Sequence, residues 1–339
     1  MPSPPAPSPL STLPPRRALA AIRRHPIRTF FVLALSAFLA LNVLAFRHAG
    51  ALTRFEADAP AGPSALEEQS LAERAQTLIR GPRLQRPRNT TTPADHGLAY
   101  TTEVLAETSP RLELWCLDLP APRGVVLLCH GYAGSKSALL PAAAEFHAQG
   151  WSTVLLDFRG SGGSEGDQTS LGVHEADDVA RAARFARQRS AGGRLVVFGN
   201  SMGAAAVLRA VFQGRIRPEA LILEAPFNRL LATVRHRFEL LGVPSFPSAE
   251  LLLFWGSVRA EINGFDHQPA TYAASVPCPT LVLHGTQDAR VSVAEVEEVV
   301  AALPEPSSLV LLEGVGHEPY LAARPDEWRA AVEPFLAQR

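Results

Sequence analysis

The hydrophobic and polar positions of this chain form one long apolar run near the N-terminus and, from about residue 97, an alternation of short apolar runs with helical patterns. A short apolar run bounded by turn residues is typical of a strand buried on both faces, as in a parallel sheet. The first two runs alternate like an antiparallel pair. The pattern therefore predicts an α/β protein with a mostly parallel, eight-stranded, doubly wound sheet. The expected strands are Leu98–Leu105, Leu112–Leu117, Gly124–Cys129, Thr153–Leu156, Leu195–Phe198, Ala220–Leu223, Thr280–Leu283 and Ser308–Leu312, and the expected helices include Ser137–Gln149, Val173–Gln188 and Ala204–Phe212.

The apolar run near the N-terminus, Thr29–Phe46, contains no charged residue. As a helix it would be about 27 Å long, close to the roughly 30 Å hydrocarbon thickness of a bilayer. Arginines are frequent before it and sparse after it, which places the N-terminus in the cytoplasm and the rest of the chain across the membrane. A cleaved signal peptide is the alternative, since Ala49–Ala51 resembles a cleavage site, but the run exceeds the usual length of about 7–15 residues. The sequence favours an uncleaved transmembrane anchor at 29–46.

Composition divides the remainder into segments. Residues 1–28 are rich in Pro, Ser, Ala and Arg, which predicts a disordered cytoplasmic tail. Residues 47–96 are expected to form a tether with a short helix at 64–79, and residues 97–339 the folded domain. A small helical cap is expected at about 227–270, between two strands of the sheet. Its apolar residues would face either a substrate or the sheet, and the sequence leaves both open.

Charge and cysteine content exclude several classes of function. The net charge of −1 over 339 residues, with no basic face, predicts no nucleic-acid partner. The three cysteines have no metal-ligand spacing, and no metal or cofactor site is predicted. The sequence does not establish whether Cys116 and Cys278 form a disulfide.

Candidate chemistry begins at Gly199–Gly203 (GNSMG), which stands between an apolar strand and an alanine-rich helical segment. Glycines two positions before and after a serine describe a nucleophile elbow, a turn so tight that flanking side chains would collide with the backbone. Gly162–Gly166 has the same spacing around Ser164, but no helix follows it directly. We therefore assign Ser164 to a loop and Ser201 as the candidate nucleophile.

A serine hydroxyl needs a histidine base and a carboxylate that orients the base. His317 follows the last expected strand, and Asp288 follows the strand before it. Glu224, at the end of Ala220–Leu223, is the alternative acid, although a carboxylate there is more often structural. The order Ser201, Asp288, His317 is typical of sheets of this kind.

An oxyanion hole would complete the site with two backbone N–H groups. One would come from Met202, directly after the serine. The other would come from Tyr132, because Gly131 allows a tight turn after the strand Gly124–Cys129. The tyrosine ring could in addition line the pocket or simply pack.

Taken together, residues 97–339 resemble the α/β-hydrolase superfamily, and are similar to the compact, serine aminopeptidase-like hydrolases tethered by one N-terminal transmembrane helix. The resemblance implies that the Asp157–Arg159 loop, Gly172–Glu175 and Asp178 are structural. The motifs that carry it are His130–Gly134 (HGYAG), Asp157–Ser164 (DFRGSGGS), Gly199–Gly203, His284–Asp288 (HGTQD) and Gly314–His317 (GVGH).

The resulting hypothesis is a membrane-anchored serine hydrolase that cleaves a carboxylic ester or thioester through an acyl-enzyme intermediate. Its partners would be a small-molecule or lipid-like acyl substrate and the membrane. Amide or peptide cleavage by the same triad is the first alternative, because specificity resides in the cap. A non-catalytic binding scaffold is the second.

Overall fold

The computed structural model describes residues 25–59, 79–190 and 193–338. The chain divides into two compact units, Met1–Leu44 and Ala45–Arg339. Most of the expected disordered tail and nearly all of the expected helix at 64–79 lie outside the described residues.

Helix α2 (Pro26–Thr53) contains the apolar run Thr29–Phe46. By length and composition it could cross a membrane. Its large apolar side chains, such as Phe30 and Leu33, are exposed. The helix continues seven residues past the predicted anchor, and its end from Ala45 onward belongs to the second unit.

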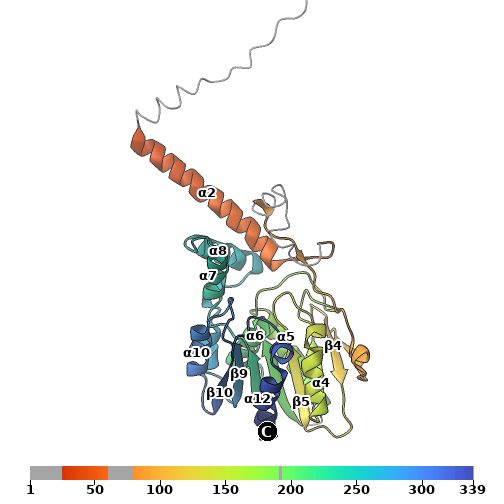
Figure 1. Cartoon of the computed structure of the whole chain (residues 1–339). Helices are drawn as coiled ribbons and strands as arrows, with labels where there is room; N and C mark the ends of the chain where they lie inside the picture. Colours follow the sequence, from red (N-terminus) through yellow and green to blue (C-terminus); the bar gives the residue numbers. More distant parts are fainter. Residues whose placement is uncertain (1–24, 60–78, 191–192, 339) are drawn as a thin grey trace, which may run out of the picture. The chain divides into compact units, whose positions relative to one another are not determined.

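The second unit is built on an eight-stranded sheet in the order β10-β9-β8-β7-β5-β6-β4-β3 (Figure 1). β4 pairs antiparallel with β3 and β6, and all other neighbours are parallel. The predicted mostly parallel, eight-stranded sheet is confirmed. The strands are β3 (Thr101–Leu105), β4 (Leu112–Leu117), β5 (Gly124–Cys129), β6 (Ser152–Leu156), β7 (Arg194–Asn200), β8 (Ala220–Glu224), β9 (Thr280–Gly285) and β10 (Ser307–Leu312).

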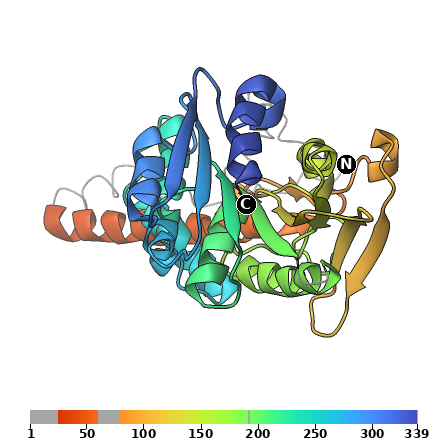
Figure 2. The same ribbon diagram turned by 90° about the horizontal axis from the view of Figure 1, so that it is seen from below.

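Helices cover both faces of the sheet (Figure 2), which explains why its central strands are apolar at every position. One core cluster joins the sheet to α5, α6, α9 and α10, and the other joins it to α4, α11 and α12. These helices are α4 (Leu140–Ala148), α5 (Glu175–Arg189), α6 (Met202–Phe212), α9 (Pro269–Ala273), α10 (Val293–Ala302), α11 (Tyr320–Ala323) and α12 (Pro325–Ala337).

The segment expected to form a cap contains α7 (Leu230–Leu240) and α8 (Ser248–Ala260), which pack side by side beyond one end of the sheet (Figure 1). Smaller elements are the parallel pair β1 (Phe55–Glu56) and β2 (Leu84–Gln85) and the 3₁₀ turns η2 (Pro93–His96), η3 (Lys136–Leu139) and η4 (Gly264–Asp266).

Strand register sets the neighbours of the serine turn. Gly199 lies opposite Cys129 of β5 on one side and Leu223 of β8 on the other. Ser201, two residues further on, is therefore flanked by the loops that follow β5 and β8. Because parallel strands end at one edge, the loops after β9 and β10 open at the same side.

Candidate active site

Ser201 stands on a strained turn between β7 and α6, with φ 50° and ψ −111°. A Cβ on Gly203 would lie 2.3 Å from the carbonyl oxygen of Cys129, and one on Gly199 would lie 2.8 Å from the Ala204 backbone. Both glycines are therefore required by backbone contacts, as the sequence pattern predicted. The Ser201 N–H donates a 2.8 Å hydrogen bond to the Glu224 carbonyl, which fixes the turn to β8.

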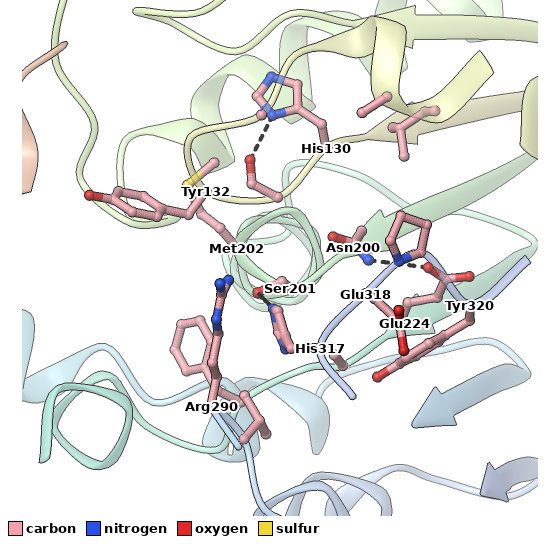
Figure 3. Close-up of a pocket in the computed structure, with 18 of the residues that line it drawn as sticks. His130, Tyr132, Asn200, Ser201, Met202, Glu224, Arg290, His317, Glu318 and Tyr320 are labelled. Atoms are coloured by element: carbon pink, nitrogen blue, oxygen red, sulfur yellow. Dashed lines mark hydrogen bonds between the residues drawn. The ribbon is translucent and has the colours of Figure 1, made fainter. Parts of the chain in front are cut away.

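The structure brings Ser201, His317 and Asp288 together from the ends of three strands (Figure 3 shows Ser201 and His317). His317 Nε2 lies 3.1 Å from Ser201 Oγ, and His317 Nδ1 lies 2.6 Å from Asp288 Oδ2. The other oxygen of Asp288 accepts backbone N–H bonds from Arg290 (2.8 Å) and Val291 (3.0 Å). Those bonds hold the carboxylate in one orientation toward the ring.

Electrostatics favour an ionised Asp288. Burial acts to raise the pKa of this carboxyl, but the bonds from His317 and the two backbone N–H groups outweigh it and keep the pKa below its usual value. An ionised carboxylate accepts the Nδ1–H of His317. The Nε2 lone pair is then free to accept the Ser201 proton.

Glu224, the alternative acid from the sequence, makes no bond to His317. Its carboxylate accepts 2.8 Å and 3.1 Å hydrogen bonds from Trp328 Nε1 and Asn200 Nδ2. Burial raises its pKa to about 7. Figure 3 shows it beside Asn200. Glu224 thus ties α12 to the residue before Ser201.

The loop after β5 approaches the serine closely at Gly131. A Cβ there would lie 2.8 Å from Asn200 Oδ1 and 3.6 Å from the Ser201 Cβ. Within the described residues, the backbone N–H groups of Tyr132 and Met202 donate no hydrogen bond to another protein group. Both N–H groups therefore lack a protein acceptor among the described residues, as the predicted oxyanion-hole donors would.

A cavity of about 260 Å³ opens at Ser201. Apolar side chains such as Leu171 and Leu230 line much of it, together with Arg237 and Arg290. Within the described part of the chain, neither arginine side chain forms an ion pair. The cavity therefore combines apolar walls with two arginines that have no ion-pair partner among the described residues, and with one exposed carboxylate, that of Glu318.

Five other histidines have hydrogen-bond or ion-pair partners of their own. His130 Nδ1–H donates to the Gly131 carbonyl (2.8 Å), and its Nε2 accepts the Phe158 N–H (3.2 Å). Burial lowers the pKa of His130, so the ring is neutral. The nearest partners of the other four are Ala260 for His174, Glu295 for His236, Leu171 for His267 and Tyr320 for His284.

Ser164, in the second G-x-S-x-G sequence, lies in a turn and is buried. Its Oγ donates a 2.6 Å bond to the Asp157 carbonyl and accepts the Glu113 N–H at 2.8 Å. The hydroxyl thus uses its donor and one acceptor position to join the loop to β4. Ser164 does not line the cavity at Ser201.

Two structural features near the site escape sequence reasoning. Lys136, the only lysine of the chain, is fully buried and pairs with Asp157 and Glu113. Its Nζ lies 4.4 Å from the Trp115 ring centroid. In the sequence, the one feature that sets Lys136 apart is that it is a single lysine among many arginines. The second feature is the Tyr132 hydroxyl, which donates a 2.6 Å bond to the Leu52 carbonyl at the end of α2.

Cys116 and Cys129 are buried free thiols, so the open question of a Cys116–Cys278 bridge is answered in the negative. Burial raises the pKa of Cys116 to about 12. Among the described residues, no group of three or more His, Cys, Asp or Glu side chains could hold a metal ion.

Comparison with known proteins places these features in context. Residues 120–251 match the family described as serine aminopeptidase, S33. An uncharacterized protein of Mycobacterium tuberculosis is 32% identical over 226 residues, which cover 63% of this chain and 72% of that protein. The lysophosphatidylserine lipase ABHD12 of Gallus gallus is 26% identical over 52% of this chain, and the match spans 46% of the lipase.

Among solved structures, an esterase of Pyrococcus furiosus has the same fold. The two superpose with a TM-score of 0.61 at 22% identity, covering 75% of this chain and 98% of the esterase.

Proposed function

Because the chain belongs to the α/β-hydrolase superfamily and is a serine hydrolase of the esterase and lipase type, we propose that it cleaves a carboxylic ester or thioester through an acyl-enzyme formed on Ser201. The main support for this proposal is the pair of short contacts that link Ser201 to His317 and His317 to Asp288. A hydroxyl 3.1 Å from an imidazole nitrogen, in a ring that is itself oriented by a carboxylate, meets the requirements of an activated nucleophile.

In the first step, Ser201 Oγ attacks the carbonyl carbon while its proton moves to His317 Nε2. Asp288 stabilises the resulting imidazolium through Nδ1–H. The N–H groups of Tyr132 and Met202 face the developing oxyanion, which is where preorganised donors lower a barrier most. The bond to the leaving oxygen or sulfur then breaks, and the His317 proton leaves with the alcohol or thiol.

In the second step, water attacks the acyl-enzyme and gives a proton to His317 Nε2. The bond between the acyl carbon and Ser201 Oγ breaks as that proton returns to the serine. The carboxylic acid is released and the enzyme is regenerated.

The cavity lining supports a particular substrate class. Its apolar walls fit an acyl chain, while Arg237 and Arg290 fit an anionic group elsewhere on the same molecule. The similarity to a lysophosphatidylserine lipase supports a lipid ester with an anionic head. Arg237→Gln should raise KM for an anionic lysophospholipid more than for a neutral monoacylglycerol, and equal changes for both would contradict this assignment.

Helix α2 is proposed as the membrane anchor, with residues 1–28 in the cytoplasm and the catalytic unit on the other side. Its length and composition and the excess of arginines before it support this arrangement. Carbonate extraction tests the anchor, because an integral protein stays with the membrane pellet. Release of a shortened chain beginning near Leu52 would indicate a cleaved signal peptide instead.

The catalytic assignment is tested with Ser201→Ala in the full-length chain. Hydrolysis of p-nitrophenyl butyrate should fall by at least about 10⁴-fold, and labelling by a fluorophosphonate probe should disappear. Ser164→Ala is the matched control, since it removes the serine of the other G-x-S-x-G sequence. This control should keep its labelling, and labelling that survives in Ser201→Ala would refute the nucleophile.

Amide cleavage is the second candidate reaction, because the matched family is described as a serine aminopeptidase. A panel of acyl esters, thioesters and aminoacyl amides separates the two by kcat/KM. If the purified chain neither reacts with the probe nor cleaves any member of the panel, a binding scaffold is the correct interpretation.

A further inference from the structure

The end of helix α2 and the residues that follow it, Ala45–Ala59, form a segment that we call the stem. It belongs to the same compact unit as the catalytic residues. Four of its hydrophobic residues are buried as deeply as core positions, and a segment that only linked an anchor to a domain would have no reason to bury them. They are Ala45, Ala49, Phe55 and Ala59.

Backbone and side-chain contacts hold the stem against the loop that precedes α5. The Thr169 N–H donates to the Thr53 carbonyl at 2.9 Å, and the Phe55 N–H donates to the Asp167 carbonyl at 2.7 Å. Arg54 adds an exposed ion pair with Asp167. These bonds lie on the three residues directly after Leu52, whose carbonyl accepts the Tyr132 hydroxyl.

The cap holds the stem from the other side. Phe46 packs edge-to-face on Trp255 of α8, with ring centroids 5.3 Å apart, and the Arg259 guanidinium lies 4.9 Å from the Phe46 ring centroid. The stem therefore lies between the cap and the loop before α5.

The stem also reaches the candidate oxyanion loop. The Tyr132 hydroxyl donates a 2.6 Å hydrogen bond to the Leu52 carbonyl, and the rings of Tyr132 and Phe55 lie 6.2 Å apart. Because the Tyr132 side chain is held by the stem, the stem borders the place where an acyl carbonyl would bind.

A second cavity, of about 70 Å³, lies between the stem, α7 and α8. One water needs about 10–15 Å³ of cavity volume, so the cavity has room for about five water-sized groups. It meets the cavity at Ser201 along a shared border. The shared residues are Tyr132, Leu171, Leu230, Thr233 and Arg237.

The hydroxyl groups around this second cavity are already used. Ser257 Oγ donates to the Leu253 carbonyl at 2.7 Å, Ser170 Oγ donates to Glu175 at 2.5 Å, and Thr53 Oγ1 donates to a carbonyl of its own helix at 2.8 Å. Apart from Arg237 at the border with the catalytic cavity, few polar groups are left to bind water, so the cavity suits methylene groups better than solvent.

We propose that this second cavity binds the distal part of the substrate's acyl chain, with the stem as one wall. The proposal rests on the proposed function, since it assigns a chain to the acyl group bound at Ser201. The chain would run from Ser201 past Tyr132 and Leu171 to Ala49 and Leu52 of the stem. The segment next to the anchor would thus set chain-length preference.

Gly256 of α8 offers a direct test, because it lines the second cavity and a Cβ there would meet no atom within 4 Å. Gly256→Leu should occupy the space of several methylenes. Burial of one methylene corresponds to about fourfold in affinity. In full-length protein in detergent, the ratio of kcat/KM for p-nitrophenyl dodecanoate to that for the butyrate should fall at least about tenfold.

Val258→Leu, on an exposed position of the same helix, is the matched control and should leave the ratio unchanged. Leu52→Ala, on the stem, enlarges the cavity and should move the optimum toward longer acyl chains. This opposite shift decides the question if Gly256→Leu does not fold. Esters with a short acyl group and a long alcohol serve as control substrates. Gly256→Leu should leave kcat/KM for these esters unchanged.

The outcomes separate this proposal from the proposed function. If wild-type protein cleaves neither ester, the proposed function fails and the acyl subsite fails with it. If wild-type protein is active but folded Gly256→Leu lowers both acyl esters alike, the function stands and the subsite is refuted. A loss confined to long alcohols would likewise refute it, because the cavity would then bind the leaving group.

Discussion

Glu224 is a buried carboxylic acid whose ionisation should control stability near neutral pH. It stands at the end of β8 and, within the described residues, forms no ion pair. Its only side-chain partners there are Trp328 Nε1 and Asn200 Nδ2, which are neutral donors. Burial raises the pKa from 4.5 to about 7 because two neutral donors do not replace the lost hydration of the charge. Glu224→Gln removes the ionisation and keeps the shape.

The sign and size of the effect follow from linkage. An acid with a raised folded-state pKa contributes stability below its unfolded pKa of 4.5 and loses it as pH rises through about 7. The difference between the two values corresponds to about 3 kcal/mol in the free energy of unfolding. For a folded unit of this size the unfolding entropy is about 0.6 kcal/mol/K, so about 3 kcal/mol shifts Tm by about 5 °C.

Thermal unfolding of wild-type and Glu224→Gln protein between pH 5 and 8.5 measures this directly. At pH 5 the variant should be less stable by about 1–2 kcal/mol, because the glutamine NH₂ faces a donor. As pH rises from 5 to 8.5, wild-type Tm should fall relative to the variant by about 4 °C, because roughly a quarter of the total change already lies below pH 5. Glu107→Gln, at an exposed glutamate, should follow the wild-type profile. Parallel profiles for wild type and Glu224→Gln would refute the reasoning, since Glu224 would then ionise as it does in the unfolded chain.

Three further predictions concern residues around the site. Asp288→Asn should lower kcat for p-nitrophenyl butyrate by about 10⁴-fold, because the amide no longer selects the His317 tautomer with a free Nε2; an unchanged kcat would exclude Asp288 as the orienting acid. Lys136→Met should lower the free energy of unfolding by about 3–5 kcal/mol in a denaturant titration, since it leaves the buried charge of Asp157 unpaired; a change below about 1 kcal/mol would contradict this. Gly203→Ala should yield no folded, probe-reactive protein, because its Cβ would lie 2.3 Å from the Cys129 carbonyl oxygen, and normal expression with wild-type labelling would disprove the contact argument.

Local sequence patterns sufficed to predict the sheet and the residues that meet at Ser201. Apolar runs mark buried strands, and in a parallel sheet every strand ends at the same edge. Ser201, Asp288 and His317 each follow such a run within a few residues, so their proximity follows from topology alone. Strand bounds differ from the predicted ones by at most three residues, chiefly because polar strand ends such as Asn200 lack an apolar signal.

Partners that are distant in sequence leave no comparable pattern. Glu224 and Trp328 are 104 residues apart, and Lys136 and Asp157 come from different strand–helix units. A sequence shows that a charged residue stands beside an apolar run, but not which residue from another element will neutralise it. The roles of Lys136 and Glu224 therefore required the folded chain.

The stem shows a further reason why sequence and structure divide the chain differently. Residues 47–59 follow the predicted anchor directly, and their composition suggests a tether. In the structure they bury Ala49 and Phe55 and accept a hydrogen bond from Tyr132. Apart from the pairing of β1 with β2, their contacts are with the cap, Tyr132 and the loop before α5, which lie more than 70 residues away and carry no periodic signal. Because the same short segment continues the anchor helix and borders the candidate oxyanion loop, a change that displaces the stem should alter chain-length selectivity before it alters the chemistry at Ser201.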